Sequence, residues 1–184
     1  MAYAASNVTT AKQGATGTIW RAPKGTTLPT DAVTALDAAF KSLGHISEDG
    51  VTFSDSKDSQ EIKNMSGDTV LTVLTGTTSK MAFSLLEGLN TEVLKATYGD
   101  EAVSGTLAAG ITANVSSNDP AECVWVFDTI LREGVLKRVV IPQGKVTETD
   151  DVVYKNDEAL TYGLTITASA DNNGCTRYEY LKGA

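Results

Sequence analysis

LTYGLTITAS, residues 160–169, alternates one apolar residue with one small or polar residue along its whole length. A period of two places the apolar members on one face of a β-strand and the polar members on the other. The segment therefore predicts a half-buried strand, within a strand region that spans residues 158–169. Further strands are expected at residues 17–20, 122–132, 135–141, 145–154 and 176–182, separated by turn residues. Many short strands at this spacing indicate a mainly β protein, built as a sandwich or a barrel.

Two helices are expected beside these strands. Residues 30–43 begin with cap residues, carry a modest apolar stripe and are followed by Gly44. Residues 91–98 follow Asn90, a favourable N-cap, and stop at Gly99, although one longer helix from residue 85 is an alternative. This second helix would be the main helix packing on the sheet.

Residues 69–75 and 80–85 are two β-prone runs, and the Gly, Thr and Ser residues at 76–79 predict a hairpin turn between them. At the N-terminus, residues 1–17 are small and polar without a period, which predicts an extended arm. Residues 47–67 form the least hydrophobic long stretch and predict a long acidic loop, which in a compact domain is usually functional. The 184 residues are most simply one domain that carries these two excursions.

The charge of the chain argues against a surface that grips nucleic acid. It has 23 acidic and 15 basic side chains, a net charge of −8, whereas duplex binding requires clustered Lys and Arg. The N-terminus has no basic cluster followed by an apolar run, and no apolar run approaches the roughly 20 residues of a membrane helix. We therefore expect a soluble protein made in the cytosol, with no membrane partner. In that compartment Cys123 and Cys175 are expected to be free thiols.

No catalytic, cofactor or metal site is predicted. His45 is the single histidine and therefore the one possible imidazole base of a nucleophilic triad, but an ordinary half-buried position is the simpler interpretation. The acidic residues at 49, 55, 58 and 61 lack the alternating ligands and central glycine of a cation loop. We interpret them as solvated, and we expect the chain not to be an enzyme.

Two aromatic pairs could belong either to the core or to a contact surface. Trp125 and Phe127 share one strand face, which is typical of core residues. Tyr178 and Tyr180 share one face of the last predicted strand, and if that strand lies at a sheet edge, an interface and a core position are both open.

Charge is distributed unevenly along the chain. Residues 1–46 carry four basic and two acidic residues, a balance of +2, whereas residues 47–70 carry six acidic and two basic residues, a balance of −4. In a head-to-tail assembly the two contacting surfaces differ, and an unclosed contact of this type propagates into a filament. Oppositely charged segments suit such an assembly, although both could simply be solvated.

Several motifs resemble the major tail tube proteins of long, non-contractile-tailed bacteriophages. The similarity covers roughly residues 28–169, and its motifs are TDAVTALDAAFKSLG (30–44), ISEDGV (46–51), GLN (88–90), VLK (93–95), YGD (98–100), VLKR (135–138) and VIP (140–142). The resemblance implies a β-sandwich or barrel-like tail-tube fold with one flanking helix. It also implies hexameric rings that stack into a tube, with DNA passing through a negatively charged bore without specific binding.

The resemblance also implies the partners of the subunit. The subunit would contact further copies of itself, and also tail terminator, tape-measure and distal tail proteins, in a virion tail assembled in the host bacterial cytoplasm. The arm and the long loop would be its assembly elements. We therefore single out as candidate assembly residues Trp20, Asp55, Asp58, Glu61, Tyr178 and Tyr180. The alternative function is an immunoglobulin-like binding module displayed on a virion or cell surface, with residues 47–67 as its recognition surface.

Overall fold

The computed structural model describes residues 7–14, 17–117 and 119–183, and these are mainly β. The helical elements are α1 (Thr91–Tyr98) and a short 3-10 turn, η2 (Arg132–Gly134). The strands are β1 (Ala11–Gln13), β2 (Ile19–Pro23), β3 (Lys41–Ser42), β4 (Ile46–Lys63), β5 (Thr69–Leu85), β6 (Val103–Thr106), β7 (Gly110–Ala113), β8 (Cys123–Leu131), β9 (Leu136–Thr149), β10 (Tyr162–Ala168) and β11 (Tyr178–Lys182). The predicted fold class, mainly β with one flanking helix, is confirmed for this part of the chain.

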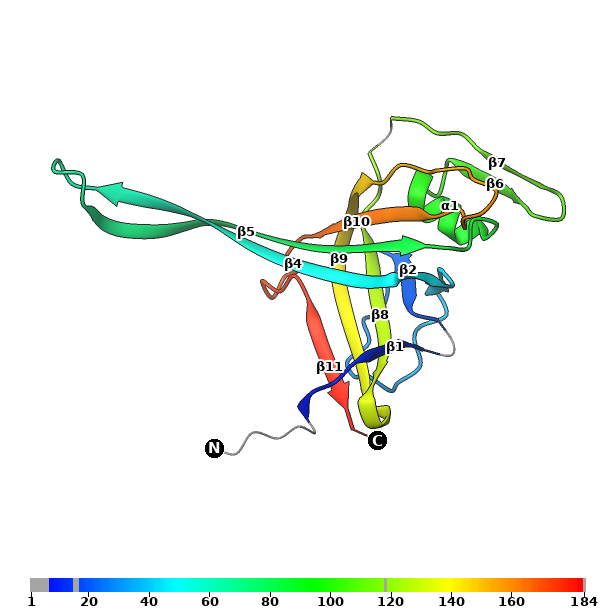
Figure 1. Ribbon diagram of the computed structural model, residues 1–184, viewed down its shortest axis with the longest axis horizontal. Coiled ribbons are helices and arrows are strands. Elements are labelled where there is room, and N and C mark those ends of the chain that lie inside the picture. Colours follow the sequence, from blue (N-terminus) through cyan, green and yellow to red (C-terminus); the bar gives the residue numbers. More distant parts are fainter. Residues whose placement is uncertain (1–6, 15–16, 118, 184) are drawn as a thin grey trace.

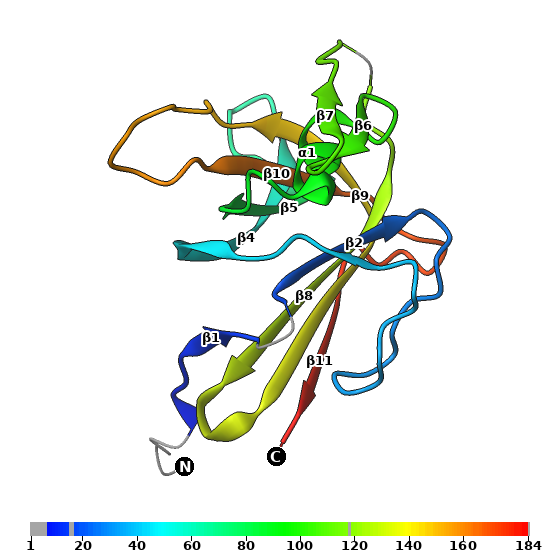
Figure 2. The ribbon, with the colours of Figure 1, turned by 90° about the vertical axis from the view of Figure 1, so that its right-hand side faces the viewer.

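One antiparallel sheet with the order β3-β2-β8-β9-β10-β5-β4 forms the body, and β6 and β7 form a separate hairpin (Figure 1). Strand β9 divides this sheet into two parts. Its first half pairs with β11 and its second half with β10, while β8 runs along its other side. Turned by 90°, the ribbon shows the β8–β9–β11 part at an angle to the β10–β5–β4 part (Figure 2).

The main core lies between these two parts of the sheet. Strand β10 buries Tyr162, Leu164, Ile166 and Ala168, so the opening alternation correctly predicts its inward face. Trp125 is 1 % exposed and donates its indole N–H to the carbonyl oxygen of Gly144 over 3.1 Å. The core interpretation of Trp125 is therefore confirmed.

A smaller core covers the opposite face of β8 and β9. It consists of Ala22, Phe40, Val124, Val126 and Val140, with partly buried residues packed around it. The irregular segment at residues 24–40 supplies several of these side chains, including Leu28, Leu36 and Phe40. This segment therefore acts as a cover for the sheet face that the main core leaves open.

The helix predicted at residues 30–43 is wrong, because this segment contains bends and a turn instead. The carboxylate of Asp31 accepts hydrogen bonds from the amides of Val33 and Thr34 over 2.7 and 2.6 Å, and Asp37 accepts one from Ala39 over 2.9 Å. Asp side chains that bond the backbone in this way compete with helix formation. Arg138 then holds the segment on the body by donating to the carbonyls of Asp31 and Thr34 over 3.1 and 2.7 Å.

Acid should weaken the Asp31 turn. Hydrogen bonds from the Thr34 hydroxyl and from the Thr34 and Val33 amides lower the pKa of Asp31 from 3.8 to about 2. A depressed pKa contributes stability that is present above the ordinary value and is lost as pH falls through the folded value. We expect Asp31→Ala to lower the melting temperature at pH 5 and the difference from wild type to shrink between pH 4 and pH 2. Thermal melts across this range test it, and a difference that stays constant down to pH 2 would exclude the mechanism.

Helix α1 is confirmed in its shorter form. The Asn90 side chain accepts a hydrogen bond from the Glu92 amide over 3.0 Å, and Gly99 ends the helix with φ 103° and an N–H bonded to the Lys95 carbonyl. Val93 and Ala96 face the main core. The longer alternative fails because Leu85 is still the last residue of β5.

Two predicted turns lie inside continuous strands. Gly76 pairs with Asp58 next to a register shift in the β4–β5 ladder, so it accommodates a bulge within β5. Pro142 similarly lies within β9, opposite the register shift between Cys123 and Trp125 of β8. Proline lacks an amide donor and is tolerated at such a bulge. Composition alone does not distinguish these bulges from chain reversals.

Candidate assembly surfaces

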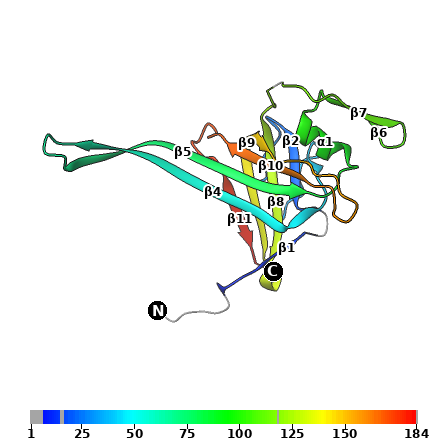
Figure 3. The same cartoon turned by 45° about the horizontal axis from the view of Figure 1, so that its top comes forward.

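Strands β4 and β5 form a long hairpin that projects from the body (Figures 1 and 3). Residues 79–85 of β5 pair with β10, whereas residues 69–78 have β4 as their partner strand among the described residues. We call the projecting part, residues 56–78, the arm. The predicted loop at residues 47–67 is therefore corrected: most of it is strand β4, and the chain reverses at residues 64–68.

Local bonds at the tip of the arm explain this correction. The Asn64 side chain accepts hydrogen bonds from the amides of Ser66 and Asp68, each over 2.9 Å, and Gly67 has a φ of 90°. A polar strand without apolar alternation resembles a loop in sequence, because periodicity detects strands with one buried face. Here every residue of β4 after Phe53 is exposed, so neither face of the strand is covered there.

The arm exposes a concentration of large apolar side chains. Each is at least 42 % exposed: Ile62, Met65, Val70, Leu71, Val73 and Leu74. Ile62 pairs with Leu71 across the two strands, so these two side chains lie on the same face of the ribbon. An isolated two-stranded ribbon is marginally stable in water, and a large exposed apolar patch marks an interaction site. The arm therefore has the properties of a segment that is covered in a larger assembly.

Sequence reasoning missed this apolar strip, although a signal was present. Residues 69–75 read TVLTVLT, which we interpreted as one strand of a hairpin with residues 80–85. The residues paired with them, 59–63, are polar except for Ile62, the one large apolar residue that can pack against them. A β-prone apolar run whose hairpin partner is polar cannot close a core by itself.

The free edges of the sheet add to this surface. Strand β4 is the last strand in the sheet order, and β5 loses its second neighbour where the arm begins. Unpaired strand edges present rows of N–H and C=O groups that can pair with another chain. Both long sides of the arm are thus available for strand addition within the described part of the chain.

The three acidic candidates occupy different positions along the hairpin and do not form one cluster. Asp55 lies at the root of the arm, where it bonds Ser79 and Arg177. Asp58 pairs with Gly76 farther out, and Glu61 accepts a hydrogen bond from the Thr69 hydroxyl over 3.0 Å near the tip. The Ser79 hydroxyl, followed by Arg177, lowers the pKa of Asp55 below its ordinary value.

The three aromatic candidates lie beside the smaller core. Trp20, Tyr178 and Tyr180 are partly buried and pack against it. The two tyrosine rings are nearly parallel, with centroids 6.5 Å apart. The Tyr178 hydroxyl donates to Asp171 over 2.6 Å, and this bond raises the pKa of Tyr178 to about 12. These contacts give the three residues a structural role, and an assembly role for them stays a prediction.

The described part of the N-terminal segment lies along the edge of β8. Strand β1 pairs with Thr129–Leu131, and the Thr129 hydroxyl donates to the Lys12 carbonyl over 2.8 Å. All three side chains of β1 are exposed. The predicted arm at residues 1–17 thus lies on the body at residues 11–13, while residues 1–6 and 15–16 fall outside the described residues.

A groove lies between β1 and the root of the arm. It has a volume of about 500 Å³, and its apolar lining includes Ile46, Val51, Phe53, Phe127, Leu131 and Val139. Phe127 therefore contacts both the core and an open surface, and its ring lies 5.9 Å from that of Phe53. Sequence reasoning did not find this groove, since its walls come from four separated segments.

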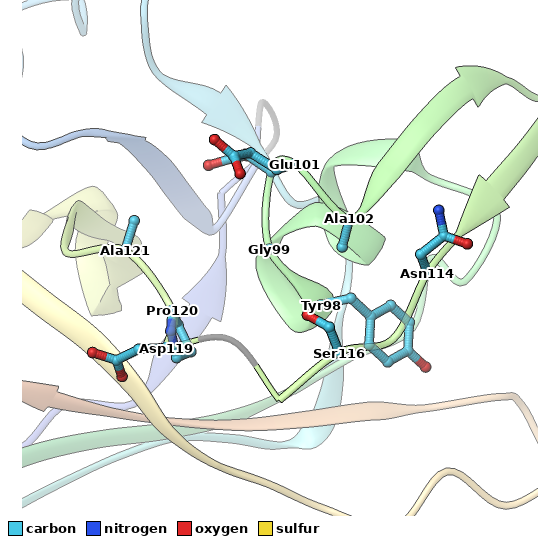
Figure 4. Close-up of a pocket in the computed structure, with 10 residues that line it drawn as sticks. Tyr98, Gly99, Glu101, Ala102, Asn114, Ser116, Asp119, Pro120 and Ala121 are labelled. Atoms are coloured by element: carbon cyan, nitrogen blue, oxygen red, sulfur yellow. The ribbon is translucent and has the colours of Figure 1, made fainter.

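A second hollow of about 580 Å³ lies beside the C-terminal end of α1 and is lined partly by residues 119–121 (Figure 4). Two carboxylates in its lining are paired with cations, Asp100 with Arg21 and Asp119 with Lys145. These pairs link β2 and β9 to the loops that follow α1. They give Asp100 and Asp119 a structural role in this hollow, whose third acidic lining residue is Glu101.

The candidate base His45 does not belong to a catalytic arrangement. Its ring bonds the Gln13 side chain over 3.1 Å, and the residue is exposed rather than half-buried as expected. Glu87 is nearby, but its carboxylate accepts from the His45 backbone amide and from the Asn90 side chain. Ser42, which lines a third hollow together with His45 and Glu87, accepts a hydrogen bond from the Gly44 amide through its hydroxyl oxygen.

The described residues show neither a candidate metal site nor a candidate membrane-spanning helix. They contain no group of three or more His, Cys, Asp or Glu side chains placed to hold a metal ion. None of their helices is long and apolar enough to cross a membrane. Cys123 and Cys175 are free thiols, as predicted, and burial raises the pKa of Cys123.

The fold and the arm define the class of protein: a β-rich structural subunit whose largest exposed feature is suited to self-association. The family profile described as phage tail tube protein matches residues 1–183, and the chain belongs to this family. It is therefore a structural component of a virion tail and not an enzyme. Membership of this family favours the tail tube function over the alternative function, a displayed binding module.

Two further comparisons add little to this assignment. Among solved structures, the chain is similar to a chain of the virion of a native gene transfer agent particle, with 10 % identity and a TM-score of 0.43. The match covers 94 % of this chain and all of that one. No curated protein matches the sequence.

Proposed function

We propose that the subunit forms hexameric rings that stack into a hollow tube, and that phage DNA passes through this tube into the host. The observation that carries the proposal is the arm, with its exposed apolar side chains and unpaired edges in a member of the tail tube family. The hexameric ring number rests on the resemblance of the sequence motifs. Assembly would take place in the host cytoplasm, with tail terminator, tape-measure and distal tail proteins as further partners.

The charge of the chain suits a conduit. Each chain has a net charge of −8, so a stack of many copies would carry a strongly negative potential. An acidic wall repels phosphate at short range. DNA would then slide through the bore without specific contacts. This role requires a high ratio of acidic to basic side chains and no recognition site for bases.

Stepwise concentration of the purified protein tests the proposal. Light scattering would give the mass in solution, and negative-stain electron microscopy would show the shape of the particles. We expect rings or hollow filaments above a threshold concentration, or after addition of a tail initiator complex. A monomer that persists under both conditions would contradict the proposal.

The N-terminal segment, residues 1–17, gives a second prediction. Removal of residues 1–16 deletes β1, whose exposed side chains add little to either core, so the truncated protein should remain folded. We expect it to lose tube formation, because the N-terminal segment would no longer bridge neighbouring subunits. Circular dichroism checks the fold and electron microscopy the tubes. Unchanged polymerisation of the truncated protein would remove this role.

A further inference from the structure

A cluster of polar contacts connects the root of the arm to the C-terminal segment. Arg177 donates from its two terminal guanidinium nitrogens to the two carboxylate oxygens of Asp55, over 3.0 and 3.5 Å, and its Nε lies 2.9 Å from a carboxylate oxygen of Glu179. The Asp55 carboxylate also accepts a hydrogen bond from the Ser79 hydroxyl over 2.6 Å, and that hydroxyl lies 3.1 Å from the hydroxyl of Thr176. We call Asp55, Ser79, Thr176 and Arg177 the arm-root cluster.

The cluster lies at the base of the arm, where contacts can determine the direction of the arm. Asp55 and Ser79 are paired across β4 and β5. Among the β5 residues that pair with β10, Ser79 is the one nearest to the arm. Beyond this point the ribbon has no neighbouring strand among the described residues. The cluster therefore lies where the arm leaves the body, next to the segment that leads into β11 (Figure 1).

The environment of the cluster favours a fixed geometry. Ser79 is 4 % exposed and the Arg177 side chain 21 %, whereas the Asp55 side chain is 44 % exposed, so the cluster is shielded on its Ser79 and Arg177 side and open to solvent at Asp55. The guanidinium also lies over the Phe53 ring, 5.0 Å from its centroid. Two carboxylates and one aromatic ring thus define the orientation of one planar cation.

The length of the arm amplifies any rotation at its root. From residue 56 to the tip, the strand runs for about 30 Å at about 3.3 Å per residue. A rotation of about 10° at the root would therefore move the tip by about 5 Å, one strand spacing. Contacts made by the tip with another subunit would lose their register after such a movement.

We propose that Arg177 is a positioning residue that fixes the direction of the arm before assembly. It does so by tying Asp55 of the arm root to the segment that precedes β11, without itself contacting another subunit. An arm held in one direction loses less conformational freedom when it docks, so a lower concentration suffices for assembly. This consequence for assembly rests on the proposed function, whereas the fixed direction of the arm in the monomer does not.

Distance measurements between spin labels test the direction of the arm in dilute monomer. One label replaces Ser66 at the tip and the other Thr149 on β9, in a Cys175→Ser background in which the remaining cysteine, Cys123, is buried. We expect Arg177→Gln to broaden the distance distribution about twofold. Arg177→Lys retains the charge but loses the planar fork, so it should restore part of the narrow distribution.

Arg132→Gln is the matched control, since it removes the same charge from an exposed side chain in the turn between β8 and β9. It should leave the distribution unchanged. If Arg177→Gln does not fold, as judged by circular dichroism, the comparison of wild type with Arg177→Lys carries the test. Equal distribution widths in wild type and in the Arg177 variants would overturn the proposal.

Polymerisation is the second readout. We expect Arg177→Gln to raise the concentration needed for tube formation about tenfold and Arg132→Gln to leave it unchanged. A broadened arm with an unchanged threshold would overturn the positioning role. If the wild-type protein forms no tubes while Arg177→Gln still broadens the distribution, the proposed function fails and the fixed direction of the arm is supported.

Discussion

Replacing residues 57–77 with an Asn-Gly turn is expected to give a folded subunit that no longer polymerises. Ser56 and Thr78 are paired in the hairpin, so a two-residue turn can close the shortened strands there. The deletion removes all six exposed apolar side chains of the arm and both unpaired edges. Its residues contribute to neither core, so the melting temperature should stay within a few degrees of wild type. Light scattering and electron microscopy measure the loss of assembly.

A change in the other hairpin provides the control for this deletion. Replacing residues 107–109 with Asn-Gly shortens the connection between β6 and β7 and removes the exposed Leu107. That variant should keep its threshold for polymerisation. Tubes formed by the arm deletion at the wild-type concentration would show that the arm is not the principal contact between subunits.

Arg138→Met is expected to destabilise the fold by about 3 kcal/mol, because removing one partner of a buried ion pair leaves the other charge uncompensated. The Arg138 side chain is 7 % exposed and binds both carboxylate oxygens of Asp128, over 2.7 and 3.0 Å. It also donates to two carbonyls of the segment at residues 24–40. The substitution therefore releases the cover of the smaller core as well as a charge, and urea unfolding measures the loss.

The neighbouring residue provides a matched comparison. Lys137 forms an ion pair with Glu179 over 2.8 Å, but its side chain is 29 % exposed. Exposed ion pairs contribute about 1 kcal/mol or less, so Lys137→Met should have a small effect. Similar losses in the two variants would mean that burial of the Arg138 pair is not what stabilises the cover.

Segments with strong local signals were predicted well from the sequence. The alternation at residues 160–169 predicts β10 and its buried face, because a strand with one face in the core needs that period. Asn90 and Gly99 similarly mark the ends of α1, since each end of the helix has its own capping residue. In both cases the determining interactions lie within a few residues of the segment.

Segments defined by distant contacts were not predicted. The stretch at residues 30–43 has helix signals, but its Asp side chains bond the backbone locally and Arg138 binds its carbonyls from β9. The arm was missed for a related reason: a polar strand has no periodic signal, and its pairing with residues 69–78 is set by the hairpin as a whole. Of the candidate residues, Asp55 proves to be part of the arm-root cluster, which the sequence could not reveal because Arg177 lies 122 residues away.

The most direct test of the account is a photo-crosslink from the tip of the arm. A benzophenone amino acid in place of Met65, which is fully exposed, would react with whatever covers the tip in the assembled protein. Mixing this variant with isotopically heavy subunits separates contacts between copies from contacts within one chain. We expect crosslinks from the tip to the body of a different copy, and we expect these crosslinks to be lost at concentrations below the polymerisation threshold. Crosslinks confined to single chains in assembled tubes would contradict the claim that the arm joins subunits.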